Sequence, residues 1–159
     1  MKTVASFEFG FVAADIDALA PFYTEVLGFA VISDLTMPTA TSRAAGLAPD
    51  GYRVVRLETN RGDRLKLARP TAPPQDGAPT AYPMQRRGAS YVTFIVDDLE
   101  SLYDKLLRAR VAIKSQGIVG LRSGVSLVLT TDPEGNWLEF VHYDDIRSYR
   151  PEDGRSAKA

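Results

Sequence analysis

Two stretches of the chain repeat one pattern, and this repeat decides the fold. They are FEFGFVAADIDALAPFYTEVLGF at residues 7–29 and YVTFIVDDLESLYDKLLRARV at residues 91–111. Each begins as an alternating strand and passes through acidic residues into an amphipathic helix. Strand-like segments follow each copy and end in a matched phrase, GDRLKL at 62–67 and GNWLEF at 135–140. Two copies of a half-sheet are expected to pack around a cleft.

In the first copy, Asp15 or Asp17 can cap the helix, and Gly28 is a natural stop. The helix has an apolar stripe formed by Leu19, Phe22, Tyr23, Val26 and Leu27. Strands are expected at about 29–34, 52–59 and 64–69. Residues 34–51 are predicted to be a long connection with a helical turn at 42–46.

In the second copy, Asp97 and Glu100 form a possible capping box. The predicted buried stripe consists of Leu99, Leu102, Leu106 and Leu107. Strands are expected at about 111–119, 125–131 and 137–143. Each copy is therefore predicted to contain a strand, a helix and three further strands.

The sequence predicts one domain over residues 1–143, built from two modules. The first module spans 4–69 and the second spans 87–143. Residues 70–86 between them are rich in Pro, Ala and Gly, which indicates an extended linker. Residues 144–159 are polar and lack periodicity, so they are expected to form a disordered tail.

Composition excludes several classes of function. The 159 residues carry a formal net charge of −1, which argues against a nucleic-acid partner. No apolar stretch approaches the length of a membrane span, and the N-terminus lacks the apolar core of a signal peptide, so a cytoplasmic protein is expected. With no cysteine and one histidine, His142, a His-rich metal centre and a Ser-His-Asp triad are hard to build. His142 is also expected to face away from Glu139.

The phrases FYTEVLGF and DPEGNWLEF, in this order along the chain, resemble the vicinal oxygen chelate superfamily. This superfamily includes glyoxalase I, bleomycin-resistance proteins and extradiol dioxygenases. The resemblance covers about residues 5–143. It implies an α+β fold in which two βαβββ modules form a U-shaped, mixed, mostly antiparallel sheet around a cleft.

In that superfamily, ligands of a metal come from the first and last strands of each module. The matching positions here are Glu8, Lys66, Tyr91 and Glu139, and Tyr91 follows Glu8 by 83 positions, as Asp98 follows Asp15. The family usually has His, Gln or Glu at these positions, so Lys66 and Tyr91 depart from the pattern. A lysine ammonium has no lone pair for a metal. We therefore expect a catalytic group of these four residues with no metal and no cofactor.

The same residues also have simpler interpretations. Glu8 can face the cleft or solvent, and Lys66 can be a surface lysine. Glu139 can be a solvent-facing strand residue, while Tyr91 can belong to the core. Trp137 shares the face of Glu139, where an indole could contact substrate and raise the carboxyl pKa by desolvation. Further cationic side chains, expected to be solvated, are Arg53, Arg56, Arg86 and Arg87.

The resulting hypothesis is a glyoxalase-like enzyme that acts on a small organic substrate. It would be a metal-independent lyase or isomerase in which one glutamate transfers a proton next to a carbonyl. Lys66 and Tyr91 would stabilise the oxyanion. The resemblance also implies a homodimer. Two alternatives remain open: a non-catalytic ligand-sequestering protein of the bleomycin-resistance type, and a divalent-metal-dependent lyase or dioxygenase.

Overall fold

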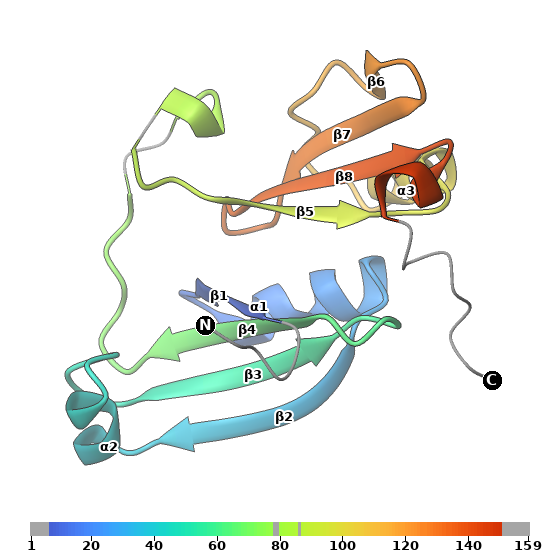
Figure 1. Ribbon diagram of the computed structural model, residues 1–159. Coiled ribbons are helices and arrows are strands. Elements are labelled where there is room, and N and C mark those ends of the chain that lie inside the picture. Colours follow the sequence, from blue (N-terminus) through green and yellow to red (C-terminus); the bar gives the residue numbers. More distant parts are fainter. Residues whose placement is uncertain (1–6, 78–79, 86, 151–159) are drawn as a thin grey trace. The chain divides into compact units, whose positions relative to one another are not determined.

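The computed structural model describes residues 7–77, 80–85 and 87–150. The chain divides between residues 79 and 80 into two compact units, each built on one four-stranded sheet (Figure 1). None of the helices in the described ranges is long and apolar enough to cross a membrane.

The first unit contains a mixed sheet in the order β1-β4-β3-β2. Strand β1 pairs in parallel with β4, and the other neighbours are antiparallel. The elements are β1 (Glu8–Val12), α1 (Ile16–Pro21), η1 (Phe22–Val26), β2 (Ala30–Met37), α2 (Thr39–Ala44), β3 (Tyr52–Glu58) and β4 (Arg64–Pro70).

The second unit repeats this arrangement in the order β5-β8-β7-β6, with β5 parallel to β8. Its elements are η2 (Pro83–Gln85), β5 (Tyr91–Ile95), α3 (Leu99–Arg108), β6 (Val119–Arg122), β7 (Val125–Thr131), β8 (Trp137–Tyr143) and α4 (Ile146–Tyr149). The α+β fold of two βαβββ modules is thus confirmed.

The repeat extends to the register of the strands. Glu8 pairs with Arg64 in the first sheet, and Tyr91 pairs with Trp137 in the second. These pairs are related by the same offsets as the sequence repeat, 83 positions in the first strand and 73 in the last. The helix caps follow the first offset, because Asp15 caps α1 and Asp98 caps α3.

An aromatic cluster fixes the first helix against its sheet. Tyr23 is fully buried and contacts Phe22 and Phe29 edge-on, with ring centroids 5.0 and 5.8 Å away. Pro21 has no N–H and cannot continue the α-helical ladder. The helix passes at this point into the wider π-helical turn η1, in which Leu27 N donates to Phe22 O. Gly28, with φ +81°, then ends the helix.

Helix α3 covers one face of the second sheet with Leu99 and Leu106, two turns apart and both buried. Strands β5 and β8 contribute a stacked pair beneath it, Phe94 and Phe140, with centroids 5.5 Å apart. Leu107 was predicted to belong to the buried stripe, but 48% of it is exposed. It lies one residue beyond Leu106, about 100° further around the helix, and so faces away from the sheet.

Several predicted boundaries were wrong where pairing overrides local sequence. Strand β2 runs on to Met37 because it pairs with β3 as far as Tyr52. The expected helical turn is α2 and begins three residues earlier, at Thr39. The strand expected at 111–119 is mostly irregular: Ile113 makes an isolated bridge, and β6 begins only at Val119.

Two predictions near helix ends also needed correction. Asp98, not an Asp97–Glu100 box, caps α3, since its carboxylate accepts bonds from the backbone and hydroxyl of Ser101. The supposed disordered tail begins with helix α4, capped by Asp145. The rest of the predicted tail, 151–159, lies outside the described residues.

Candidate functional site

In the second unit, Glu139 lies near the middle of β8 and pairs in register with Thr93 of β5. Thr93 Oγ1 donates a 2.6 Å hydrogen bond to Glu139 Oε2. No other hydrogen bond to the Glu139 carboxylate comes from a described residue, so Oε1 is available to a ligand. A carboxylate oriented by one donor and otherwise open is suited to accept a proton.

Glu139 lines a hollow of about 290 Å³ on the sheet face opposite α3. The polar lining residues are Thr93, Arg122, Glu139, Tyr143, Tyr149 and Arg150. Ile95, Leu121, Val125 and Val141 supply an apolar part. The hollow therefore combines one carboxylate, two guanidinium groups and two phenols with apolar surface, which suits a small polar organic molecule.

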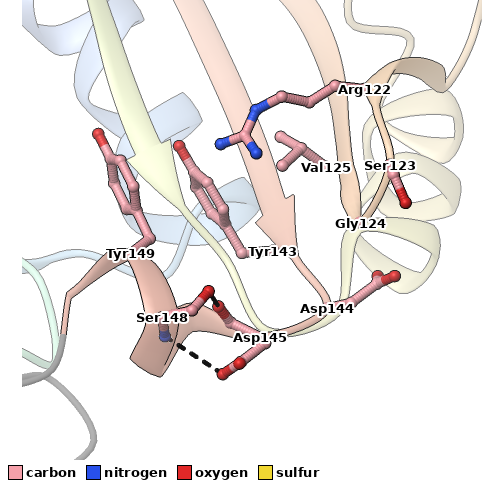
Figure 2. A pocket seen from close by; sticks show the side chains of 9 residues that line it. All are labelled: Arg122, Ser123, Gly124, Val125, Tyr143, Asp144, Asp145, Ser148 and Tyr149. Carbon is pink, nitrogen blue, oxygen red and sulfur yellow. Dashed lines mark hydrogen bonds between the residues drawn. The ribbon is translucent and has the colours of Figure 1, made fainter.

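A smaller hollow of about 260 Å³ adjoins it and shares Arg122, Val125, Tyr143 and Tyr149 (Figure 2). Tyr149 comes from α4, and its ring stacks on that of Tyr143 with centroids 4.5 Å apart and planes 11° from parallel. This stack holds α4 against the end of β8. Sequence reasoning missed these residues because Tyr149 lies in the supposed tail, although the strand alternation that placed Glu139 also reaches Tyr143.

Tyr91 and Trp137 form a register pair two positions before Thr93 and Glu139. The pleat therefore places them on the same sheet face as Glu139, as expected for Trp137. Tyr91 is 41% exposed, which excludes the core interpretation. As described, neither residue lines the hollow around Glu139. A contact between Trp137 and substrate stays a prediction.

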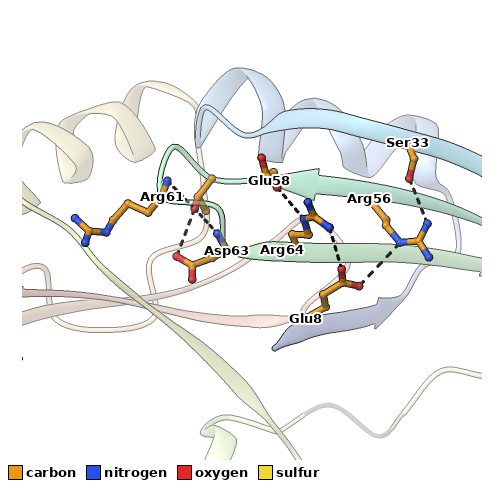
Figure 3. A network of polar contacts seen from close by, with 8 residues as sticks. Glu8, Ser33, Arg56, Glu58, Arg61, Asp63 and Arg64 are labelled. Carbon is orange, nitrogen blue, oxygen red and sulfur yellow. Dashed lines mark hydrogen bonds and ion pairs between the residues drawn. The ribbon is translucent and has the colours of Figure 1, made fainter. Parts of the chain in front are cut away.

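In the first unit, Glu8 lies inside a cluster of cations (Figure 3). Its Oε2 is 3.4 Å from Lys66 Nζ and 4.0 Å from Arg56 Nε, and its Oε1 is 3.6 Å from Arg64 Nη1. Arg64 also forms a 2.8 Å ion pair with Glu58. Two of the predicted site residues, Glu8 and Lys66, are thus in contact.

Gly10 lies beneath the Lys66 side chain that makes this contact. It pairs in register with Lys66, and a Cβ placed on it would lie 3.9 Å from both Cβ and Cε of that lysine. The lysine side chain therefore runs across the glycine to reach Glu8 on the same strand. Lys66 is partly exposed and ion-paired, so a role for it in the site stays a prediction.

The cations determine the protonation of Glu8. Burial alone would raise the pKa of this carboxyl, but Lys66, Arg56 and Arg64 together hold the pKa below its ordinary value. Glu8 consequently stays ionised at neutral pH with its oxygens directed at positive charges. This arrangement makes it a weak proton acceptor.

Two arginines expected to be solvated are instead paired. Arg53 bridges Asp34 and Asp17 at 2.8 and 2.7 Å, which ties β3 to β2 and to the first turn of α1. Arg56 approaches Glu8 and donates to Ser33 Oγ at 3.4 Å. Of the other two arginines in that prediction, Arg87 is exposed and Arg86 lies outside the described residues.

His142 has a structural position, as expected. Its Nδ1 is 3.1 Å from Val96 O, and its Nε2 is 3.7 Å from Asp144. Along β8 it lies on the same face as the core residues Leu138 and Phe140, and so it faces away from Glu139.

The donor set at the family's ligand positions does not fit a divalent metal. Glu8 already faces three cations, and Lys66 presents an ammonium. Across residues 7–77, 80–85 and 87–150, no group of three His, Cys, Asp or Glu side chains could hold a metal ion. A metal at this position would have to displace positive charge and would gain few ligands.

The sequence of this chain matches a known protein family. The model of the Glyoxalase/Bleomycin resistance protein/Dioxygenase superfamily matches residues 6–140. The chain belongs to this superfamily. The match includes Glu8, Lys66, Tyr91 and Glu139. It ends before Tyr143 and Tyr149, the two tyrosines of the hollow. No curated protein matches the chain.

Solved structures show the same fold at low sequence identity. A glyoxalase family protein from Bacillus cereus has a TM-score of 0.75 and 19% identity, covering 90% of this chain and 96% of that one. The trypanothione-dependent glyoxalase I of Leishmania major has a TM-score of 0.62 and 19% identity, covering 92% and 91%. A lactoylglutathione lyase from Agrobacterium tumefaciens has a TM-score of 0.58 and 21% identity, covering 89% and 96%.

Proposed function

We propose that this superfamily member is a metal-independent lyase or isomerase that moves a proton on the carbon next to a carbonyl of a small organic molecule. The observation that carries the proposal is the geometry of Glu139. Its carboxylate lies in a hollow of about 290 Å³, receives one hydrogen bond from Thr93, and has a second oxygen open to a ligand.

The proposal assigns the role of base to Glu139 rather than to Glu8. A base must accept a proton in the transition state, and positive charges beside it oppose this by favouring the ionised form. Glu8 has three such charges within 4.0 Å. Among the described residues, none forms an ion pair with Glu139, and its carboxylate accepts one hydrogen bond from the neutral Thr93 hydroxyl.

Removal of a proton next to a carbonyl places negative charge on the carbonyl oxygen. The proposal keeps Lys66 and Tyr91 as the groups that stabilise this oxyanion, and Trp137 as a substrate contact. The support is their position in the strands. Lys66 lies on the last strand of the first module and Tyr91 on the first strand of the second, which are the positions that the resemblance implies, and Trp137 shares the sheet face of Glu139. That all of them meet in one site with Glu8 and Glu139 stays a prediction.

The test is hydrogen–deuterium exchange at the carbon next to the carbonyl of pyruvate and hydroxyacetone, followed by NMR in D₂O. The wild-type protein should accelerate exchange, and Glu139→Gln should remove the acceleration. Glu100→Gln, which changes an exposed glutamate on α3, is the matched control and should behave as wild type. Exchange that persists in Glu139→Gln would refute the assignment of the base.

A second candidate function is ligand sequestration without turnover. The stacked pair of Tyr143 and Tyr149 favours it, because two parallel rings give a rigid aromatic wall that can hold a planar ligand. In that case ligands should bind saturably, and no exchange should occur with either ketone. Binding and exchange measured on the same sample separate the two functions.

We also propose a homodimer. Within the first sheet, β1 and β2 are edge strands, and the side chains of Val12 and Val31 are 63% and 54% exposed. Exposed apolar edges invite pairing with another chain. Light scattering should give twice the chain mass at micromolar concentration, and a monomer mass would contradict the proposal.

A further inference from the structure

The hollow around Glu139 carries more positive than negative charge. Arg122 enters it from the end of β6, and Arg150 enters from the residue after α4. In this described lining, Glu139 is the single acidic residue. Two guanidinium groups from separate elements therefore converge on one small space that holds one carboxylate.

Arg122 differs from the paired arginines of the first sheet. Arg53, Arg56 and Arg64 each face a carboxylate. Within residues 7–77, 80–85 and 87–150, the Arg122 side chain has no ion-pair or hydrogen-bond partner. A guanidinium with open donors can bind a carboxylate through two parallel hydrogen bonds.

The tyrosine stack forms one side of the hollow, and Arg150 lies beside it. The guanidinium carbon of Arg150 lies 6.0 Å from the ring centroid of Tyr149, which itself stacks on Tyr143. Asp145 caps helix α4, which carries Tyr149, by accepting hydrogen bonds from Arg147 N and Ser148 N. Figure 2 shows both rings side by side, with the Arg122 side chain extending toward them. The C-terminal segment thus supplies part of the binding surface.

The phenol of Tyr143 adds a hydrogen-bond donor. Burial, together with the neighbouring Tyr149 hydroxyl, raises the pKa of Tyr143 above its ordinary value. The phenol therefore remains protonated at neutral pH. A protonated phenol beside two guanidinium groups favours an anion over a neutral ligand.

We propose that the substrate of this site is a small carboxylate, held through its carboxylate group by Arg122 and Arg150. The apolar side chains Ile95, Val125 and Val141 would contact its carbon skeleton, and the carbon next to the carbonyl would face Glu139. This inference rests on the proposed function, because it names the substrate class of the same site.

The binding test uses two probes that differ in charge and not in shape, phenylacetate and phenylacetamide. Their affinities are measured by NMR titration of the full chain. Phenylacetate should bind about tenfold more tightly than the amide. Arg122→Met and Arg150→Met should each reduce phenylacetate affinity about tenfold and leave amide affinity unchanged.

Arg108→Met is the matched control, since Arg108 is an exposed arginine in the last turn of α3. It should leave both affinities unchanged, and amide spectra of each variant should show an intact fold. If Arg122→Met unfolds, Arg122→Lys serves instead, because it keeps the charge and loses the bidentate geometry. Equal affinities of the two probes, a lack of binding by both, or no effect of either arginine variant would overturn the inference.

Exchange kinetics separate this inference from the proposed function. Arg122→Met should raise KM for pyruvate about tenfold with little change in kcat, and should affect KM for the neutral hydroxyacetone much less. If Glu139-dependent exchange occurs and both probes bind equally, the proposed function stands and the anion site is wrong. If phenylacetate binding depends on Arg122 and neither ketone exchanges, the anion site stands and the proposed catalysis is wrong.

Discussion

The two sheets have the same strand order and the same register, yet their equivalent side chains differ in kind. Gly10 faces Lys66 across β1 and β4, and the equivalent pair across β5 and β8 is Thr93 and Glu139. In the first sheet the cation crosses the glycine to reach Glu8. In the second sheet the threonine hydroxyl holds the carboxylate in place.

This difference shows that the repeat preserves a backbone scaffold and not a site. The first sheet carries an ion network in which Glu8 and Glu58 are neutralised by neighbouring cations. The second sheet carries a hollow in which Glu139 keeps an open oxygen. Proton transfer suits the second arrangement better, because protonation of Glu8 would break three favourable interactions.

The largest expected effect comes from replacing each of the two glutamates in a separate variant. Glu139→Gln should reduce ketone exchange by at least about 100-fold, as expected for loss of a general base. Glu8→Gln should reduce it by less than about tenfold, because the structure makes Glu8 an ion-pair partner. The measurement is the initial rate of deuterium incorporation into pyruvate. The reverse order of effects would move the base to the first sheet.

Lys66→Met should have the next largest effect. It removes a proposed oxyanion donor, so kcat for exchange should fall about 100-fold. The fold should remain intact, since the lysine is partly exposed and its removal leaves no buried charge. Circular dichroism checks the fold, and exchange kinetics check the rate. A wild-type rate would remove Lys66 from the site.

The same variant tests the electrostatics of Glu8. With Lys66 gone, the pKa of the Glu8 carboxyl should rise toward its ordinary value of 4.5, while Arg56 and Arg64 keep part of the depression. Because the folded-state pKa is lowered, the ion pairs stabilise the fold above the unfolded-state value. This stabilisation is lost as the pH falls through the folded-state pKa. ¹³C NMR titration of the Glu8 carboxyl measures the shift.

The sequence predicted the scaffold well because its signals are local and repeated. Strand alternation, acidic caps and the matched final phrases are each encoded within a few residues, and they placed Glu8, Lys66, Tyr91 and Glu139 on the correct strands. Long-range pairing was not encoded in this way. The extension of β2 to Met37 depends on β3, and no feature of residues 35–37 shows it.

The side-chain contacts of the site were less predictable. Thr93 could have been found, since it lies 83 positions after Gly10 and opposite Glu139. The role of Tyr149 could not, because its stacking on Tyr143 depends on a four-residue helix whose stability comes from packing. The sequence predicted that Arg56 is a solvated charge, whereas the sheet places it beside Glu8.

Removal of either of the two equivalent helix caps should have a smaller effect, on thermal stability. Asp15→Ala and Asp98→Ala each remove a carboxylate that accepts two hydrogen bonds at the start of an equivalent helix. Each should lower Tm by about 2–4 °C. The two losses should be similar, because at Asp98 the Ser101 hydroxyl, 2.6 Å away, takes the place of the second backbone donor that Asp15 has. Thermal unfolding measures both, and an effect at one cap alone would contradict equivalence.

The smallest expected effect is that of added divalent metal. A site with a micromolar Kd would stabilise the fold by about 2.7 kcal/mol at a hundredfold excess of metal over Kd, which would raise Tm by roughly 5–10 °C. Lys66 and two arginines surround Glu8. We therefore expect Mn²⁺ or Zn²⁺, added at about 100 times a micromolar Kd, to shift Tm by less than about 1 °C. Lys66→His replaces the ammonium with a metal ligand and should give the larger shift. Purified protein that holds one metal per chain and loses it in Glu139→Ala would instead establish a metalloenzyme.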